Sequence, residues 1–276
     1  MTRVQLSSGI SLNVEEAGSG PPVVLLHGFT GSAAGWGTFR DELTPAFRTI
    51  AVDIVGHGQS DAPADVGAYA MSRVVDDLVE AVAAVGVERA HWLGYSMGGR
   101  TALHVAATHP EAVRSLVLIG ASPGLATEEE RMARRASDAA LCRRIEEDGL
   151  EAFIDYWESI PLFASQRTLP ATVRERIRAG RAANRAVGLI NSLRGMGTGE
   201  QEPLHDRLSA LTVPALLLAG ELDTKYVEIG EGMAVAMPAA RFVRVPGAGH
   251  AAHIENPGFC AAEVRAALIA YEGARP

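Results

Sequence analysis

One serine has the surroundings that nucleophilic or basic catalysis requires. Ser96 is the centre of Gly94-Tyr95-Ser96-Met97-Gly98, between a buried apolar segment and a helical one. A serine at the apex of a tight strand-to-helix turn projects its hydroxyl into a cleft, and the flanking glycines let neighbouring backbones approach closely. The pattern predicts that Ser96 is catalytic, but Gly-x-Ser-x-Gly also arises by chance in a chain with 29 glycines.

Two further residues complete the arrangement that activates a serine. Asp223 follows one predicted strand and His250 follows the next, in the order serine, acid, histidine. We expect Asp223 to fix the tautomer of His250, and His250 to accept the Ser96 proton. The alternatives are a helix N-cap for Asp223 and a hydrogen-bonded loop residue for His250. Weaker candidates for these roles are Glu221, His253, His57 and Asp53, the last two of which are expected to brace their loop.

A reaction at Ser96 that develops negative charge needs fixed donors nearby. Such an oxyanion site combines the N–H after the nucleophile with one from the loop after an earlier strand. These are the backbone N–H groups of Met97 and Phe29, and Gly28 lets the Phe29 backbone lie close to the serine. A plain turn at this loop is the alternative.

Strand and helix patterns alternate along most of the chain. Apolar runs predict strands at 4–6, 12–14, 23–26, 49–52, 91–95, 113–119, 214–219 and 241–245, and helical spacing predicts helices at 36–43, 71–85, 97–109, 229–237 and 258–271. We therefore expect an α/β fold whose mostly parallel central sheet carries helices on both faces, with ligands beyond the carboxyl ends of its strands. Residues 125–204 interrupt the alternation and are helical in pattern. They predict an inserted helical cap between core segments 1–124 and 205–276.

Composition narrows the class of protein. The 276 residues are 47% hydrophobic and carry a net charge of −8, which argues against general nucleic-acid binding. No apolar run approaches the roughly 20 residues of a membrane span, and residues 1–5 show no signal region. The two cysteines, Cys142 and Cys260, form neither a disulfide framework nor a metal motif. We expect a cytoplasmic monomer without metal or cofactor, which acts on a small molecule and binds neither nucleic acid nor membrane.

The core motifs resemble the α/β-hydrolase superfamily over nearly the whole chain. Further segments resemble one family in it, the 2-succinyl-6-hydroxy-2,4-cyclohexadiene-1-carboxylate synthases of menaquinone biosynthesis. The tight turn at Ser96 and the set of Ser96, Asp223 and His250 are shared across the superfamily. Arg100 and the cap segments, by contrast, are specific to that family. The matching segments are 27–31, 94–100, 122–125, 131–138, Trp157 with 161–163, Arg181 with Asn184, 192–199, 223–226 and 250–257.

That resemblance implies a lyase rather than a hydrolase. Such an enzyme eliminates pyruvate from a succinyl-enolpyruvyl-cyclohexene carboxylate, with Ser96 as the base that takes a ring proton and without an acyl-enzyme. Substrate carboxylates would be held by Arg100, Arg134 and Arg181, and the pocket would be shaped by Tyr95 and Trp157. His205 and Tyr226 stand where the family often has other aromatic residues, which leaves the seating of the cap open.

The charge pattern agrees with a substrate that has several carboxylates. About half of the arginines lie between Arg131 and Arg194, and arginine grips a carboxylate through two parallel bonds. Arg100 follows Ser96 by one helical turn and can share its side of the helix. Four other cap arginines are expected to form solvent-exposed ion pairs with Glu146, Glu147 and Glu175 instead of binding substrate. They are Arg143, Arg144, Arg174 and Arg178. Two other functions remain open, a serine hydrolase of esters or of carbon–carbon bonds in ring-cleavage products, and a ligand receptor that keeps the fold.

Overall fold

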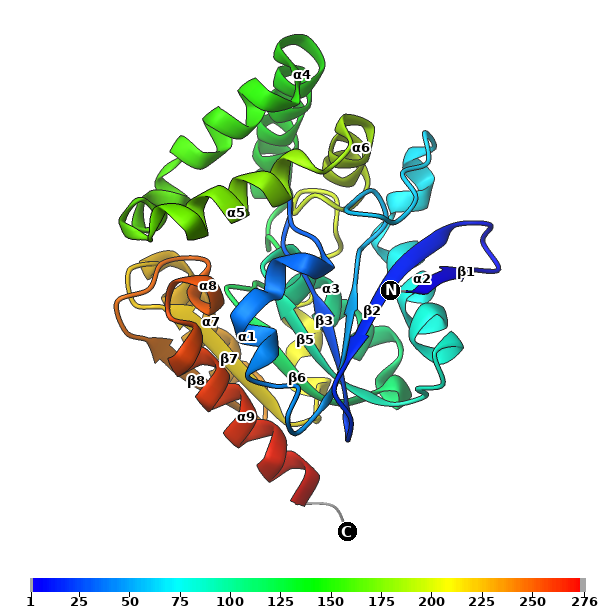
Figure 1. The fold of residues 1–276 in the computed structure, drawn as a ribbon, viewed down its shortest axis with the longest axis vertical. Helices are drawn as coiled ribbons and strands as arrows, with labels where there is room; N and C mark the ends of the chain where they lie inside the picture. The colour runs from blue at the N-terminus through cyan, green and yellow to red at the C-terminus, as the bar shows by residue number, and fades with distance from the viewer. Residues whose placement is uncertain (1, 274–276) are drawn as a thin grey trace.

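The computed structural model describes residues 2–273, which form one eight-stranded sheet in the order β1-β2-β4-β3-β5-β6-β7-β8 (Figure 1). The pairs β1–β2 and β2–β4 are antiparallel, and every other neighbouring pair is parallel. The mostly parallel sheet is therefore confirmed. The strands are β1 (Thr2–Gln5), β2 (Ser11–Ala17), β3 (Pro22–Leu26), β4 (Arg48–Val52), β5 (Ala90–Tyr95), β6 (Val113–Ile119), β7 (Ala215–Gly220) and β8 (Ala240–Val245).

Helices cover both faces of this sheet. The strand β3 shows why its apolar run is continuous, since Val24 and Leu26 pack into the core on one face while Val23 and Leu25 pack into the core on the other. The first face is covered by α2 (Met71–Ala84), α3 (Met97–Thr108) and α7 (Thr224–Ala236). The second face is covered by α1 (Gly37–Asp41), α8 (Ala252–Glu255) and α9 (Pro257–Gly273).

Of the five helical segments between β6 and β7, the first four form a cap above the carboxyl ends of the parallel strands (Figure 1), and the fifth, η5 (His205–Ala210), leads into β7. The first four are α4 (Glu128–Ser159), η4 (Pro161–Thr168), α5 (Ala171–Ala182) and α6 (Ala186–Met196). Their shared core includes Phe153 and Leu189. Gly149, at φ 83°, bends α4 into two arms, so the second arm and α5 lie over the site described below.

The ion pairs of this cap differ from the sequence prediction. Arg144 pairs with Asp148, and Arg178 pairs with three carboxylates of α4 rather than with Glu175. Glu146 pairs instead with Arg194, and Arg143 and Arg174 have no ion pair within residues 2–273. The predicted pairs were wrong because the packing of α5 and α6 against α4 brings Arg178 and Arg194 to carboxylates that are distant in sequence, while Arg144 pairs with a carboxylate one turn further along its own helix.

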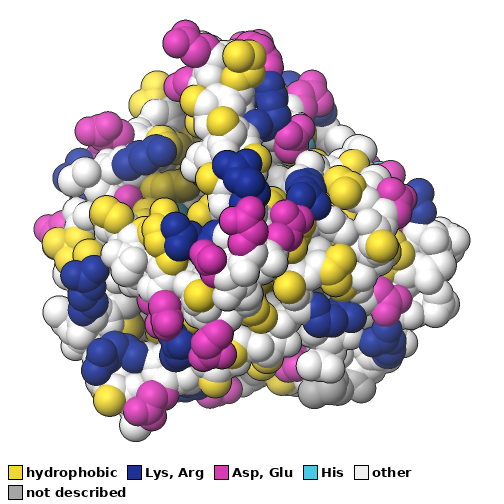
Figure 2. Space-filling model, turned by 90° about the horizontal axis from the view of Figure 1, so that it is seen from above, with side chains coloured by type: hydrophobic (Ala, Val, Ile, Leu, Met, Phe, Trp, Pro, Cys, Tyr) yellow, Lys and Arg dark blue, Asp and Glu magenta, His cyan; other side chains and the backbone are white. Residues whose placement is uncertain are grey.

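The surface seen from the cap side carries basic and acidic side chains interspersed around a hollow with hydrophobic walls (Figure 2). Among residues 2–273, no helix combines the length and the apolar character needed to cross a membrane.

One buried histidine of the core makes stability depend on pH. His104 in α3 has an Nε2 atom without a partner among the described residues, and burial lowers its pKa to about 4, helped by the charges of Arg100 and Arg207. The unfolded chain, with a histidine pKa near 6.5, binds this proton first as pH falls. The contribution of His104 to the free energy of unfolding is therefore complete above pH 6.5. It is lost as the pH falls from 6.5 to 4, at up to about 1.4 kcal/mol per pH unit.

We therefore expect His104→Leu to lose less stability on acidification than the wild type. Urea unfolding at pH 7.0 and at pH 4.5 measures the loss in each protein, and the difference between the two losses should be about 2 kcal/mol. Equal losses in the two proteins would contradict the assignment.

Candidate active site

Ser96 connects β5 to α3 in a conformation that few residues adopt. Its φ of 51° and ψ of −110° hold the serine at the apex of the turn. A Cβ on Gly98 would lie 2.0 Å from the carbonyl oxygen of Leu26, and one on Gly94 would lie 2.2 Å from that of Gly98. The turn is this tight because both flanking positions lack a side chain.

Gly98→Ala is accordingly expected to destabilise the protein by at least about 3 kcal/mol, because backbone rather than a mobile side chain blocks the new methyl group. The matched control is Gly232→Ala in the interior of α7, where a Cβ meets no atom within 4 Å. That change should stabilise the protein by about 0.5–1 kcal/mol through helix propensity. Thermal unfolding measures both, and similar melting temperatures for the two variants would refute the argument.

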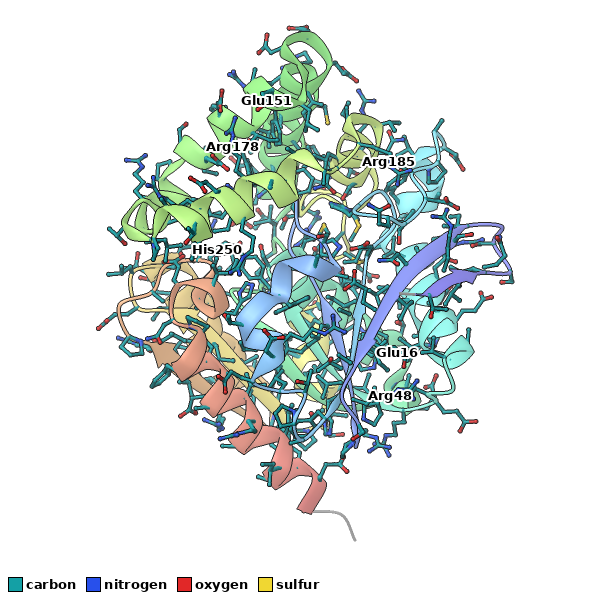
Figure 3. All side chains as sticks on the ribbon, in the orientation of Figure 1. Glu16, Arg48, Glu151, Arg178, Arg185 and His250 are labelled. Atoms are coloured by element: carbon teal, nitrogen blue, oxygen red, sulfur yellow. The ribbon has the colours of Figure 1, made fainter. Side chains whose placement is uncertain are left out.

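Ser96, His250 and Asp223 form a hydrogen-bonded array. His250 Nε2 lies 3.0 Å from Ser96 Oγ, and His250 Nδ1 lies 2.7 Å from Asp223 Oδ2. The imidazole therefore donates from Nδ1 to the carboxylate, and its Nε2 accepts from the serine hydroxyl. His250 is buried between the core and α5 (Figure 3). Asp223 does precede α7, which begins five residues earlier than predicted, but its side chain makes no capping hydrogen bond.

The weaker candidates for the roles of Asp223 and His250 either hydrogen-bond to other groups or lie outside this site. The Asp53 carboxylate accepts hydrogen bonds from two backbone N–H groups and from the Asn13 amide, which confirms that it braces its loop. Burial, mainly, lowers the pKa of His57 to about 3, and its Nδ1 donates to a backbone carbonyl 3.2 Å away. Glu221 accepts from the backbone N–H of a loop glycine. His253 lies in a different cavity.

Two backbone N–H groups beside Ser96 are free to bind a ligand. Neither the Phe29 nor the Met97 N–H donates to a protein acceptor within residues 2–273. The loop of Phe29 lies against the serine, since a Cβ on Gly28 would be 3.5 Å from Ser96 Cβ. Free donors on two converging segments are what an oxyanion site requires.

A cavity of about 360 Å³ opens over Ser96 beneath the cap. Among the residues that line it are Tyr95, Ser96, Arg100, Arg134, Trp157 and His250. The Trp157 Nε1–H is buried without a partner among the described residues. A ligand acceptor would satisfy this donor, because buried polar groups without hydrogen bonds are costly.

Arg100 is the unneutralised cation of this cavity. Its side chain is buried, and its Nη1 donates to the Met196 carbonyl at 3.2 Å and to the Gln201 side-chain oxygen. Burial lowers its pKa to about 10, so the guanidinium remains charged at neutral pH, and it has no ion pair within residues 2–273. Arg134, by contrast, donates from Nε to Asp138 at 2.8 Å. An anionic ligand would neutralise Arg100 without displacing another carboxylate.

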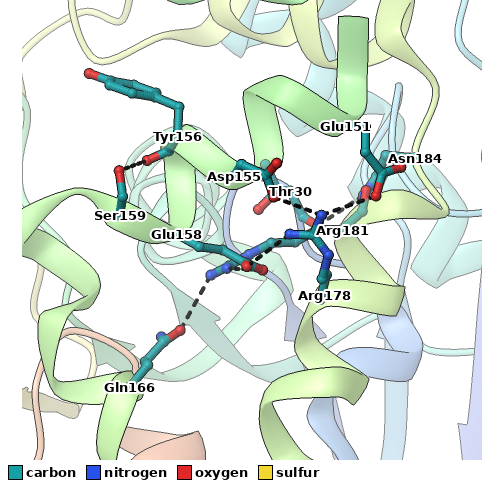
Figure 4. Close-up of polar contacts among 10 residues, drawn as sticks. All are labelled: Thr30, Glu151, Asp155, Tyr156, Glu158, Ser159, Gln166, Arg178, Arg181 and Asn184. Atoms are coloured by element: carbon teal, nitrogen blue, oxygen red, sulfur yellow. Dashed lines mark hydrogen bonds and ion pairs between the residues drawn. The ribbon is translucent and has the colours of Figure 1, made fainter.

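Arg181 is the predicted substrate residue that the structure does not place among the lining residues of this cavity. Its guanidinium carbon lies 4.9 Å from the ring centre of Phe163. The guanidinium also pairs with Glu158 at 2.9 Å and reaches Gln166 at 3.4 Å (Figure 4). The Phe163 ring also lies 6.2 Å from that of His250. The Phe163 ring therefore lies near both Arg181 and His250, and it lines this cavity whereas Arg181 does not.

Sequence reasoning missed three residues that shape the cavity. Asp138 was detectable, because it follows Arg134 by four residues in a helical segment. Phe163 belongs to a segment that matched the family but carried no predicted role. Gln201, the partner of Arg100, stands 101 residues away from it without any local pattern.

Comparison with known proteins places these features in a family. The family model for the alpha/beta hydrolase fold matches residues 21–257. A protein of Enterobacter sp. (strain 638) named 2-succinyl-6-hydroxy-2,4-cyclohexadiene-1-carboxylate synthase is 33% identical over 242 residues, 88% of this chain and 89% of that protein. A protein of Bacillus subtilis (strain 168) that bears the same name provisionally is 45% identical over 256 residues, 92% of this chain and 93% of that protein.

Solved structures agree in fold. MenH from S. aureus superposes with a TM-score of 0.90 at 29% identity, covering 95% of this chain and 98% of its own. A thermophilic esterase from Thermogutta terrifontis, solved with malate bound, superposes with a TM-score of 0.86 at 29% identity, covering 98% and 99%. The chain has the α/β-hydrolase fold and belongs to the 2-succinyl-6-hydroxy-2,4-cyclohexadiene-1-carboxylate synthase family.

Proposed function

We propose that this protein is the carbon–oxygen lyase that eliminates pyruvate from 2-succinyl-5-enolpyruvyl-6-hydroxy-3-cyclohexene-1-carboxylate. The product is 2-succinyl-6-hydroxy-2,4-cyclohexadiene-1-carboxylate, an intermediate of menaquinone biosynthesis. The names of the relatives support this reaction. The observation that carries it in this chain is Arg100, a buried cation in the cavity of Ser96 that pairs with no carboxylate among residues 2–273. A neutral ester substrate gives no reason to bury such a charge.

The serine array acts as a base in this proposal. His250 accepts the Ser96 proton while Ser96 Oγ takes a ring proton, and Asp223 stabilises the imidazolium that results. The electron pair of the broken C–H bond at ring carbon 2 forms the C2–C3 double bond, while the pair of the existing C3–C4 double bond moves to C4–C5 and expels the enolpyruvyl oxygen from C5. The leaving group departs as the enolate of pyruvate and then takes up a proton. No bond forms between Ser96 and the substrate.

The remaining groups hold the substrate and stabilise its charge. The N–H groups of Phe29 and Met97 would stabilise negative charge that develops on the side of the ring carboxylate. Arg100 and Arg134 would bind substrate carboxylates, and the Trp157 Nε1–H offers a further donor. The helical cap, residues 125–204, would supply the wall that excludes water.

Release of pyruvate tests the reaction directly. The protein is incubated with the enolpyruvyl substrate, and pyruvate is coupled to lactate dehydrogenase so that NADH consumption follows turnover. We expect NADH consumption that depends on enzyme concentration. A rate equal to the background without enzyme would refute the proposal.

A serine hydrolase is the second candidate, because an esterase shares the fold and a hydrogen-bonded serine, histidine and aspartate can also serve ester hydrolysis. A hydrolase of this kind forms an acyl-enzyme, whereas the proposed lyase does not. Intact-mass measurement after rapid mixing with p-nitrophenyl esters separates the two. An acyl group trapped on Ser96, together with rapid ester turnover and no pyruvate release, would favour the hydrolase.

The cellular setting follows from the proposal. Cys142 and Cys260 are free and buried, which suits a reducing compartment such as the cytoplasm. We propose a monomer that works there on a small polycarboxylate, independently of nucleic acid.

A further inference from the structure

A second cavity lies beside the catalytic one, between α5 and the loop that follows β3. Residues that line it include Gly28, Trp36, Tyr95, Arg176, Arg181 and His253. Tyr95, Phe29 and Phe163 line both cavities. Aromatic side chains and the loop of the free Phe29 N–H therefore form the wall between the two spaces.

The charge of this second cavity is positive. Two arginines line it, and none of the described residues in its wall is an aspartate or a glutamate, although the chain as a whole carries a net charge of −8. Arg176 has no ion pair or side-chain hydrogen bond within residues 2–273, and its guanidinium lies over Gly37, where a Cβ would be 3.4 Å from Cζ. Arg181 is partly neutralised by Glu158. The exposed Arg176 and the partly neutralised Arg181 together favour the binding of an anionic ligand in this cavity.

Two polar atoms in the wall have no partner. Trp36 Nε1 and His253 Nδ1 are buried without a hydrogen bond to any described residue, and their rings lie 4.9 Å apart. Burial, followed by the charge of His250, lowers the pKa of His253 to about 3, so its imidazole is neutral at physiological pH. A buried polar group without a hydrogen bond destabilises the folded protein. A ligand oxygen that reached these two atoms after a small side-chain movement would recover part of the lost stability.

We propose that this second cavity binds a small monocarboxylate of the 2-oxo acid class, with its carboxylate at Arg176 and Arg181 and its other end at Trp36 and His253. If the proposed function holds, this ligand is the released pyruvate, and the identity of the ligand rests on that function. The leaving acid then crosses only the wall of Tyr95 and Phe163 to reach a cavity that favours its charge. The larger, dicarboxylate product stays with Arg100.

The three tryptophans allow a direct test by NMR. In a ¹H–¹⁵N spectrum each indole Nε1–H gives one signal, and Trp→Phe variants assign them. Trp36 reports on the second cavity, Trp157 on the catalytic cavity, and Trp92, whose Nε1 donates to a backbone carbonyl at 3.0 Å in the core, serves as the internal reference. Titration with pyruvate at millimolar concentrations should shift the Trp36 signal, whereas uncharged pyruvamide should not. A shift of the Trp157 signal alone, or of no signal, would overturn the proposal.

A pair of variants on α5 tests the charge. Arg176→Ala should raise the pyruvate Kd read from the Trp36 signal by about fivefold, the effect of one partly exposed charged contact. Arg174→Ala removes an equally exposed arginine of the same helix that does not line this cavity, and it should leave the Kd unchanged. Equal losses in both variants would mean that the cap attracts anions only through its general charge, and the proposal would fail.

This experiment is independent of turnover. Pyruvate release without a Trp36 shift would overturn the second cavity and leave the lyase standing. A saturable Trp36 shift without pyruvate release would support the cavity and refute the lyase. A Trp36 shift with the cyclohexadiene product but not with pyruvate would show that an arm of the bound product fills this space, and would also overturn the proposal.

Discussion

Ser96→Ala is expected to lower kcat by at least about 10³-fold, the scale seen when one member of a serine array is removed. The Ser96 hydroxyl is the group within 3.0 Å of His250 Nε2 that can accept a ring proton as it passes its own proton on. Alanine leaves the imidazole without the atom that reaches the substrate. Pyruvate release at saturating substrate measures the change.

A second serine of the same cavity provides the control. Ser137, on α4, lines the cavity but is not one of the two side chains that hydrogen-bond to His250, which are Asp223 and Ser96. Ser137→Ala should retain kcat within a few-fold of wild type. A loss below tenfold in Ser96→Ala would exclude Ser96 as the base. The ligand-receptor alternative would gain support if this variant kept full biological function.

Arg100→Ala is expected to weaken kcat/KM by roughly 30-fold to several thousand-fold. This range corresponds to the loss of about 2–5 kcal/mol when one partner of a buried charge pair is removed. The expected loss is large because the Arg100 guanidinium is buried away from water, and the substrate carboxylate would be its ionic partner in this cavity. The folded protein should not lose stability in proportion, since the variant also removes a buried charge that no carboxylate compensates.

Two variants make this measurement specific. Arg194→Ala removes a cap arginine that pairs with Glu146 outside the cavity, and its kinetics should match wild type. Arg100→Lys keeps the charge but loses the planar fork, and we expect it to recover only part of the activity. Wild-type kinetics in Arg100→Ala would refute a carboxylate-binding role, and a matching loss in Arg194→Ala would assign the effect to the charge of the cap as a whole.

Patterns that are local in sequence predicted the core well. The run at β3 is apolar at every position because both faces are buried, and that signature needs no knowledge of the partners. The glycines around Ser96 are equally local, because the tight turn itself excludes side chains at those positions. The boundary of α7 was less accurate, since residues before Ile229 carry no strong apolar periodicity yet continue the helix back to Thr224.

Local sequence patterns did not predict the contacts between segments that are distant in sequence. Asp223 satisfies the sequence rules for an N-cap, but the approach of β8 brings His250 to its carboxylate and gives it a different partner. Arg181 matched the family position, but its surroundings depend on η4, which brings the Phe163 ring centre to 4.9 Å from its guanidinium carbon. A side chain on a long helix reaches whichever cavity the packing of that helix presents to it.

The amino-acid sequence alone determined the sheet, the sharp turn at Ser96 and the order of the three residues of the array, because each depends on residue types over a few positions. Tertiary structure decided which cations face which space. Within the described part of the chain it left Arg100 without a carboxylate partner, paired Arg134 with Asp138, and directed Arg181 and Arg176 to a second cavity. Electrostatic partners are set by distance in space, and the cap brings together charges from α4 and α5 that the chain order keeps far apart.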